Sequence, residues 1–371
     1  MSSATQDYRL SGDLLGPVLA ILDAVIDPYL GRGLVSAGCV TQLAMTGKTL
    51  QLTLVYPYPC KSQYAATVAQ LTPGLLGLEG VEAVECHPSF QAGNFRTATS
   101  GTALDKVKHV IAVASGKGGV GKSTTAVNLA LALAAEGARV GILDADIYGP
   151  SIPLMLGIPD FKPMSPDGKH IAAAEVHGIA AQSLGFLISA EDATVWRGPM
   201  AAGALTQLLN ETQWPELDYL VVDMPPGTGD IQLTLSQKVP LSGAVIVTTP
   251  QDIALADAKK GIVMFQKVNV PVLGIVENMS FHVCSECGHR EHPFGADGGR
   301  KIAERYRVPL LGALPLQLQI REAMDKGAPC VVAQPESEVT QIYSDIARKV
   351  GAALAVSQPK ANISISVTDE E

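Results

Sequence analysis

The sequence predicts an α/β fold: a doubly wound, mostly parallel sheet preceded by a small α+β domain. From residue 107 onward, short apolar runs alternate with helical segments, and several runs are too apolar to have a solvent-facing side. Before residue 90, the periodicity instead indicates a helix, two strands, a helix and a strand. We therefore expect a small domain at 1–90, a linker at 91–106, a large domain at 107–356 and a flexible acidic tail at 357–371.

The small domain is expected from two local patterns. Apolar residues recur at helical spacing between positions 14 and 25. Leu50, Leu52 and Leu54 alternate with polar residues, which is typical of a strand with one buried face. The linker that follows is rich in Gly, Ser, Thr and Ala and lacks periodic apolar residues.

The large domain shows six apolar runs that we expect to be strands. They are Val110 to Ala114, Val140 to Leu143, Tyr219 to Val222, Ala244 to Val247, Val272 to Val276 and Leu310 to Leu314. A last helix is expected at about 337–355. Strands that are buried on both faces and separated by helices predict a parallel sheet covered on both sides.

Composition narrows the classes of function. The 371 residues include 47% hydrophobic and 17% charged residues, which favours a globular chain with a large core. The net charge of -9 argues against a nucleic-acid partner. No signal sequence and no apolar stretch long enough for a membrane span is visible, so we expect a cytoplasmic protein without a membrane partner.

A glycine-rich loop follows the first expected strand of the large domain and precedes a helix. Its glycines, which allow backbone N–H groups to turn toward a phosphate, are Gly116, Gly118, Gly119 and Gly121. Lys122 adds a positive charge, and Ser123 adds a hydroxyl for Mg²⁺. The pattern predicts the phosphate-binding loop of a P-loop NTPase. A second lysine, Lys117, lies inside the loop. It either contacts a phosphate or is a solvated charge.

Polar residues at the ends of other expected strands can complete a Mg·ATP site. Asp144 and Asp146 follow one strand and Asp223 ends another, where ligands of open α/β sheets bind. Asp223 is the candidate acid for Mg²⁺, held directly or through water, and the Pro-Pro-Gly loop after it suits sensing of a γ-phosphate. Asn278 either pairs with the adenine edge or caps a turn.

The chain has six cysteines, too few for a disulfide framework at this length, and only Cys284 and Cys287 are close in sequence. Two thiolates are half of the four ligands that a tetrahedral zinc or a cubane cluster needs. Three alternatives remain: a zinc site completed by His289 and His292, a redox dithiol, or a site shared by two chains.

The segment KGGVGKS resembles the deviant Walker A motif of ATPases that act in septum placement, partitioning, nitrogenase reduction and cluster transfer. In those relatives the extra lysine, here Lys117, reaches the nucleotide of the partner subunit, which implies a homodimer. From about Lys108 to Ala355, the chain resembles the Mrp/ApbC-type iron-sulfur cluster carriers through SGKGGVGKS, LDADIYGPS, VWRGPM, DMPPGTGDIQLTLSQ, GIVENMS and CxxCG.

This resemblance implies an ATP-binding, slowly hydrolysing carrier that passes a 4Fe-4S cluster to apo iron-sulfur proteins and works with assembly scaffold proteins. The cluster would be shared by Cys284 and Cys287 of two subunits. Lys117, Lys122 and Asp146 would be catalytic, and Ser123, Asp146 and Asp223 would hold Mg²⁺ directly or through water. The implied ATP-binding residues are Gly116, Lys117, Gly118, Gly119, Val120, Gly121, Lys122, Ser123, Thr124 and Asn278.

The small domain resembles the MIP18-like unit that precedes the ATPase in this family. Relatives usually have Cys-Pro after the second strand, whereas here Lys61 follows Cys60. The four-cysteine N-terminal site of longer carriers is missing, so no permanent second cluster is expected. The alternative function is a partitioning or positioning ATPase, which would need a basic DNA-binding face or a basic amphipathic C-terminal helix.

Overall fold

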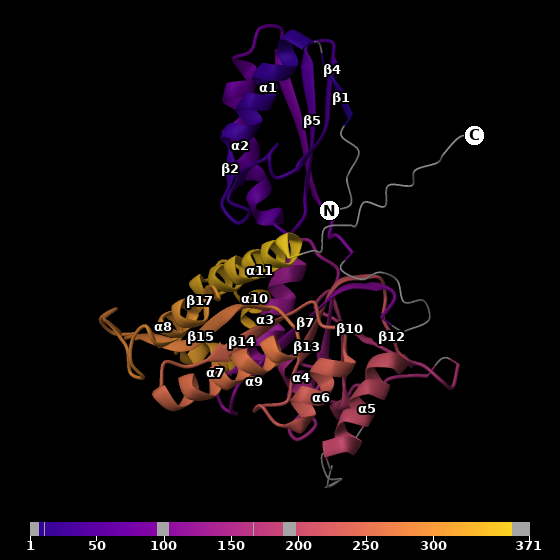
Figure 1. Ribbon diagram of the computed structural model, residues 1–371, viewed down its shortest axis with the longest axis vertical. Helices are drawn as coiled ribbons and strands as arrows, with labels where there is room; N and C mark the ends of the chain where they lie inside the picture. Colours follow the sequence, from indigo (N-terminus) through magenta and orange to yellow (C-terminus); the bar gives the residue numbers. More distant parts are fainter. Residues whose placement is uncertain (1–6, 11, 95–103, 166, 188–197, 358–371) are drawn as a thin grey trace, which may run out of the picture.

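The computed structural model describes residues 7–10, 12–94, 104–165, 167–187 and 198–357. A small domain lies above a larger one in Figure 1, and the last helix runs along the boundary between them. Most of the expected linker and tail, and the first part of the VWRGPM motif, lie outside the described residues. No helix within these ranges is long and apolar enough to cross a membrane.

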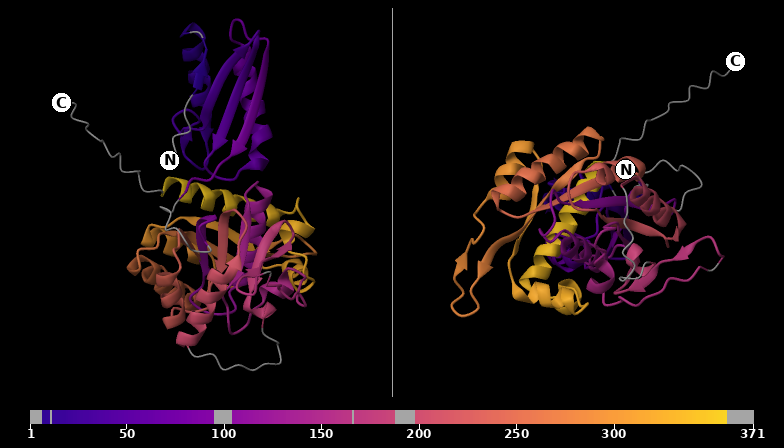
Figure 2. Two further views of the ribbon diagram at one scale, coloured as in Figure 1. Left: turned by 90° about the vertical axis from the view of Figure 1, so that its right-hand side faces the viewer. Right: turned by 90° about the horizontal axis from the view of Figure 1, so that it is seen from below.

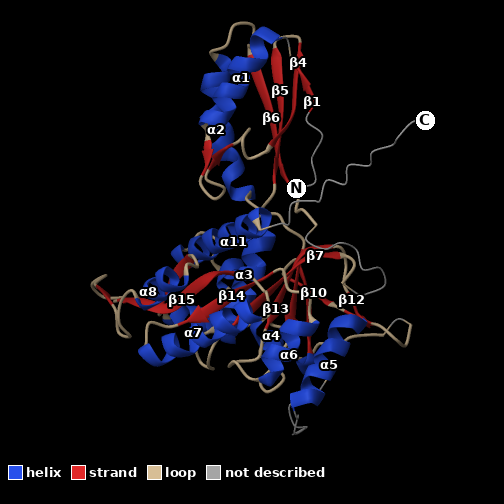
Figure 3. Cartoon of the chain, viewed as in Figure 1, coloured by secondary structure: helices blue, strands red, loops and turns tan. Residues whose placement is uncertain are grey.

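The small domain packs two helices, α1 (Gly12–Ala24) and α2 (Tyr64–Leu76), against one face of a four-stranded sheet (Figure 3). The expected order of helix, hairpin, helix and strand is present, and a short parallel strand is added at the edge. Leu50, Leu52 and Leu54 are fully buried, as the alternation predicts. The strands are β1 (Asp7–Arg9), β4 (Val40–Thr46), β5 (Thr49–Tyr56) and β6 (Ala83–Phe90), with a separate hairpin of β2 (Ile26–Asp27) and β3 (Arg32–Gly33), and η1 (Lys61–Gln63) precedes α2.

The large domain is built on a nine-stranded sheet in which β10-β11-β8-β13-β7-β14-β15-β16 are neighbours and β17 also pairs with β15. All pairs are parallel except those of β10 and β16 at the edges. Its strands are β7 (Val107–Ala114), β8 (Val140–Asp144), β10 (Ala174–Val176), β11 (Ile179–Ser183), β13 (Leu217–Asp223), β14 (Gly243–Thr248), β15 (Val272–Val283), β16 (Arg290–Glu291) and β17 (Leu310–Pro315). A separate small pair joins β9 (Ile171–Ala172) to β12 (Thr212–Gln213).

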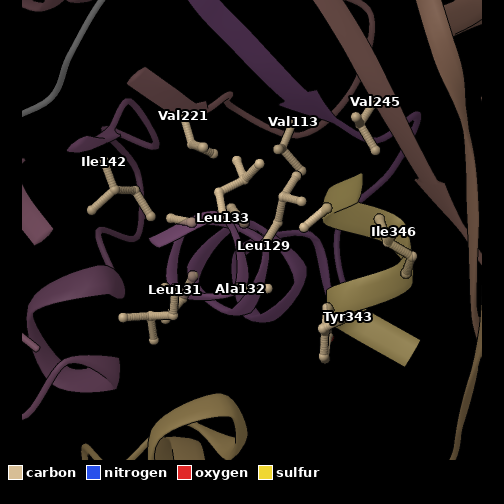
Figure 4. Close-up of a cluster of buried hydrophobic side chains, with 14 of the residues drawn as sticks. Val113, Leu129, Leu131, Ala132, Leu133, Ile142, Val221, Val245, Tyr343 and Ile346 are labelled. Atoms are coloured by element: carbon tan, nitrogen blue, oxygen red, sulfur yellow. The ribbon is translucent and has the colours of Figure 1, made fainter. Parts of the chain in front are cut away.

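Helices cover both faces of this sheet, which makes the fold doubly wound. One apolar core lies under α3 (Lys122–Ala135), α4 (Ile152–Met155), α9 (Leu318–Asp325), α10 (Cys330–Ala333) and α11 (Glu338–Val356). The other lies under α5 (Gly198–Glu211), α6 (Asp230–Lys238), α7 (Asp252–Lys267) and α8 (Gly298–Tyr306), with η2 (Leu184–Phe186) between β11 and the described part of α5. Figure 4 shows Leu129 and Leu133 of α3 directed toward Val113 and Val221 of the sheet, with Ile346 of α11 beside them.

The structure contains every strand expected for the large domain and corrects two points. The strand β11 is not predicted by the sequence pattern, because its residues IAAQS are small and partly polar, although all of them are buried. The sequence pattern predicts that Asn278 lies at the end of a strand, but β15 continues to Val283. The extension persists because Phe281 pairs with Pro315 of β17, and His282 and Val283 pair with β16.

The two domains meet around one buried ion pair. Glu136, at the C-terminal end of α3, accepts hydrogen bonds from Arg348 of α11 and from the backbone and hydroxyl of Ser62 in the small domain. Arg348 also donates to the hydroxyl of Tyr29, 2.7 Å away. The small domain therefore contacts the end of α3 that lies farthest from Lys122, its first residue.

We expect Arg348→Met to lower the free energy of unfolding by about 3–5 kcal/mol, because Glu136 would remain buried without its cation. Urea titration followed by circular dichroism measures this change. Arg321→Met is the matched control, since the Arg321–Asp325 pair is solvent-exposed and should contribute below about 1 kcal/mol. Equal, small losses in the two variants would show that the domain boundary does not depend on this pair.

Candidate functional site

The glycine-rich loop lies between β7 and α3, at the carboxyl end of the sheet. Gly121 has φ +82°, and a methyl group there would lie 2.1 Å from the Nδ2 of Asn278. A methyl group on Gly116 would lie 2.3 Å from the backbone of Asp257 in α7. Both positions therefore require glycine, because a side chain would clash there. Gly121 also requires it because of its positive φ.

Lys122 is held by carboxylates of two neighbouring strands. Its Nζ lies 2.7 Å from Oδ1 of Asp223 and 3.7 Å from Oδ2 of Asp146. It also donates to the hydroxyl of Ser123 at 3.2 Å. The side chain is 6% exposed, so the ion pair with Asp223 is largely shielded from water and strong. The structure thus brings together four of the residues that the sequence assigned to nucleotide, Mg²⁺ and catalysis.

Asp223 has the environment of an acid that holds a metal ion. It is completely buried, and burial raises the pKa of its carboxyl, while Lys122 opposes this shift. Its Oδ2 has no hydrogen-bond partner among the described residues. A buried, unpaired carboxylate oxygen beside the Ser123 hydroxyl is the donor set that Mg²⁺ prefers, so these residues fit the ion.

Asp144 supports the site from within. It lies beside Asp223 in the register of β8 and β13, and it accepts hydrogen bonds from the backbone N–H groups of Asp146 and Ile152 and from the Ser183 hydroxyl, each at 3.1 Å. Burial, reinforced by the charge of Asp223, raises the pKa of Asp144 to about 7. Its contacts fix the backbone of Asp146 and the start of α4, so Asp144 supports Asp146 rather than being only a charge at the end of a strand.

Asn278 contacts the phosphate loop directly. Its Nδ2 donates to the carbonyl of Val120 at 2.9 Å, and its Oδ1 accepts from the backbone of Met279, which has φ +55°. The amide therefore stabilises the loop conformation. Adenine recognition by Asn278 stays a prediction.

Two further residues that the sequence assigned to the nucleotide site are Lys117, inside the loop, and Thr124, just after it. The carbonyl of Lys117 accepts from the Ser115 hydroxyl at 2.8 Å. Its side chain is partly exposed and forms no ion pair within the described ranges. Thr124 lies in the first turn of α3 and is also partly exposed. The proposed roles of both residues remain predictions.

Cys284 and Cys287 lie at the tip of a hairpin formed by the end of β15 and β16. Figure 2 shows this hairpin projecting from the body of the domain. Cys284 pairs with His289 through its backbone N–H at 2.9 Å, and its carbonyl accepts from Gly288 at 2.9 Å. Backbone N–H groups of Cys287 and Glu286 point at the Cys284 sulfur and lower the pKa of its thiol, which favours the thiolate that binds metals.

The histidines of the hairpin are not arranged to complete a zinc site with the two thiols. His292 is hydrogen-bonded through Nδ1 to the carbonyl of Ser280, 2.8 Å away. Throughout the part of the chain that the structure describes, no group of three or more His, Cys, Asp or Glu side chains is placed to hold a metal ion. The two cysteines thus offer two ligands from one chain.

Cys60 lies in the core of the small domain. It is fully buried, and burial together with the charge of Asp27 raises the pKa of its thiol. Asp27 itself accepts hydrogen bonds from Tyr58 and from two backbone N–H groups. A buried thiol with a raised pKa is unreactive, so Cys60 behaves here as a packing residue.

Sequence reasoning missed contacts that hold the site from outside the motifs. Glu277, buried in β15, accepts from Ser280 and from the N–H of Gly299, which fixes α8 against the strand that carries Asn278. The N–H of Gly227 donates to the carbonyl of Ser115 at 3.0 Å and ties the loop after Asp223 to the phosphate loop. Such contacts join segments far apart in the chain, and local patterns carry no signal for them.

Two family models match the chain. The first is described as the NUBPL iron-transfer P-loop NTPase and matches residues 106–351. The second is described as an iron-sulfur cluster assembly protein and matches residues 17–86. These matches confirm the resemblance of both domains that the motifs indicated.

Several characterised proteins are similar over most of the chain. The iron-sulfur cluster carrier protein of Escherichia coli K12 is 55% identical over 327 residues, covering 88% of this chain and 89% of the relative. The mouse iron-sulfur cluster transfer protein NUBPL is 55% identical over 249 residues, covering 67% of this chain and 78% of the relative. A nucleotide-binding protein of Archaeoglobus fulgidus, solved in complex with ADP, superposes with a TM-score of 0.56 at 39% identity, covering 64% of this chain and 92% of that chain. Together they confirm the P-loop NTPase fold.

We expect Lys122→Met to weaken Mg·ATP binding by at least about 100-fold, because the charged hydrogen bonds from Nζ to the phosphates would be lost. Isothermal titration calorimetry measures the affinity directly. Lys169→Met, at an exposed position, removes the same charge and should leave the affinity unchanged. An affinity retained in Lys122→Met would contradict the assignment of this lysine to the phosphates.

Proposed function

This chain belongs to the family of iron-transfer P-loop NTPases, and from that premise we propose that it binds ATP and carries an iron-sulfur cluster held between two copies of itself. The observation that carries the proposal is the pair of thiols at the tip of the hairpin. Backbone N–H groups lower the pKa of the Cys284 thiol, and Cys287 is exposed beside it. A 4Fe-4S cluster needs four such ligands, and a second copy supplies the missing two.

The surface around the phosphate loop supports pairing of two copies. Large apolar side chains are exposed after the carboxyl ends of several strands of the sheet, and they are Tyr148, Leu154, Leu187, Ile253 and Leu318. Apolar groups gathered at one end of a domain are typical of an interaction surface. The small domain lies at the opposite end of α3, where Ser62 contacts Glu136, and so leaves this surface open.

The site residues take distinct parts in the proposed hydrolysis. The loop N–H groups and Lys122 bind the phosphates, and Asp146 orients the water that attacks the γ-phosphorus. Lys117 of one copy contacts the phosphates in the other. Mg²⁺, held by Ser123, Asp146 and Asp223 directly or through water, would neutralise phosphate charge. Since the chain contributes positioning and charge rather than covalent chemistry, hydrolysis is expected to be slow.

Nucleotide binding can reach the cluster because both sites lie on β15 or next to it. Asn278 contacts the phosphate loop from this strand, and Cys284 follows six residues later, directly after its end. We propose that ATP-dependent pairing of the two copies tightens or opens the cluster site. The recipients are apo iron-sulfur proteins, and scaffold proteins supply the cluster. The expected cytoplasmic location stays a prediction.

The cysteine pair gives the direct test. After anaerobic reconstitution, the wild-type protein should hold about four iron atoms per two chains, with brown absorbance. Cys284→Ser and Cys287→Ser should each lose most of this iron, because serine is a poor cluster ligand. Cys86→Ser in the small domain, where the thiol is partly buried, is the control and should keep it. Iron retained in the double Cys284→Ser, Cys287→Ser variant would refute the proposed site.

A second test separates the two lysines of the loop. Lys117→Ala should keep ATP affinity within about threefold of wild type but lower kcat by at least about 100-fold, because its charge acts on the partner's nucleotide. Mixing Lys117→Ala with a variant that lacks a functional nucleotide site of its own should restore part of the activity, since one competent site forms in the mixed dimer. Equal losses of affinity in Lys117→Ala and Lys122→Ala would place both lysines on the same nucleotide.

A further inference from the structure

The loop formed by residues 224–229 connects the metal-binding acid to α6. At its start, Asp223 binds Lys122 through Oδ1 and leaves Oδ2 without a partner among the described residues. In its middle, Gly227 is tied to Ser115 of the phosphate loop. The loop is thus linked at two points to the phosphate loop and its lysine.

At the other end of this loop, Gln232 lies in the first turn of α6. The residue is 2% exposed, and neither Nε2 nor Oε1 of its side chain has a hydrogen-bond partner in the described part of the chain. Its backbone carbonyl, in contrast, accepts from the Ser236 hydroxyl at 2.7 Å. Within Gln232 it is therefore the side-chain amide that lacks hydrogen-bond partners in the described part of the chain.

A buried amide with both ends unpaired destabilises the state in which it occurs, because it has lost its bonds to water without replacement. A methionine of similar length would fill the same space without that cost. Native proteins satisfy nearly all buried polar groups, so an unsatisfied one calls for a specific reason. Because Gln232 lies in the first turn of the helix that directly follows the 224–229 loop, we infer that its amide finds hydrogen-bond partners in another conformation of this loop.

We propose that Gln232 is a positioning residue for ATP hydrolysis, and that its amide forms hydrogen bonds when a γ-phosphate rearranges the loop that begins at Asp223. Gln232 does not touch the nucleotide and takes no part in bond making or breaking. It stabilises the loop arrangement in which Asp223, Lys122 and Asp146 face the phosphates. The inference rests on the proposed ATP hydrolysis and does not depend on the cluster.

The test compares melting temperatures of wild-type protein and Gln232→Met in three states: without nucleotide, with Mg·ADP and with Mg²⁺ and a non-hydrolysable ATP analogue. Without nucleotide and with ADP, Gln232→Met should melt about 2–4 °C higher, because the unpaired amide is gone. With the ATP analogue this advantage should disappear or reverse. In steady-state assays, kcat should fall about 10-fold while KM for ATP changes less than about twofold.

Gln237→Met, at an exposed position near the end of α6, is the control and should show the same melting difference from wild type in all three states. A constant difference for Gln232→Met as well would overturn the proposal, as would a lower melting temperature without nucleotide. If the melting differences and the kcat of Gln232→Met change as expected but the wild-type protein transfers no cluster, the carrier function fails while the role of Gln232 stands. The two failures are therefore distinguishable.

Discussion

The ion pair between Lys122 and Asp223 is the interaction on which the rest of the site depends. It is buried at the carboxyl end of the central strands, with Asp146 nearby and Asp144 adjacent in register. One cation among three carboxylates leaves an excess of negative charge in a buried site. The pKa values of Asp144 and Asp223 are raised, because burial and the repulsion from neighbouring carboxylates both disfavour the charged forms.

This arrangement gives nucleotide binding a physical consequence. Phosphates that approach the loop need Lys122, so the lysine must leave Asp223 at least in part, and that carboxylate then requires another cation. In the proposed function Mg²⁺ would be that cation, because it is bound by oxygen ligands of this kind. The exchange would change the partner of Asp223, which directly precedes the 224–229 loop. The conformation of this loop can therefore differ between the nucleotide-bound and the nucleotide-free site.

The domain arrangement leaves the end of α3 that begins with Lys122 free of the small domain. The small domain is fixed at the C-terminal end of α3 by Arg348, Glu136 and Ser62, whereas the phosphate loop precedes the other end of this helix. These buried contacts at the domain boundary thus keep the small domain away from the surface proposed for pairing. In the proposed function, β15 connects the nucleotide site to the cluster site, because it carries Asn278 and ends directly before Cys284.

The fold class, the phosphate loop and the cysteine pair can be predicted from the amino-acid sequence, because each depends on residues that are close in the chain. Apolar runs, glycine spacing and Cys-x-x-Cys are local patterns with a direct physical meaning. The tertiary structure alone decided that Asp144 supports Asp146, that Asn278 lies within a longer strand and holds the loop at Val120, and that Gln232 is buried unpaired. These features depend on contacts between strands and helices distant in sequence, so no local pattern specifies them.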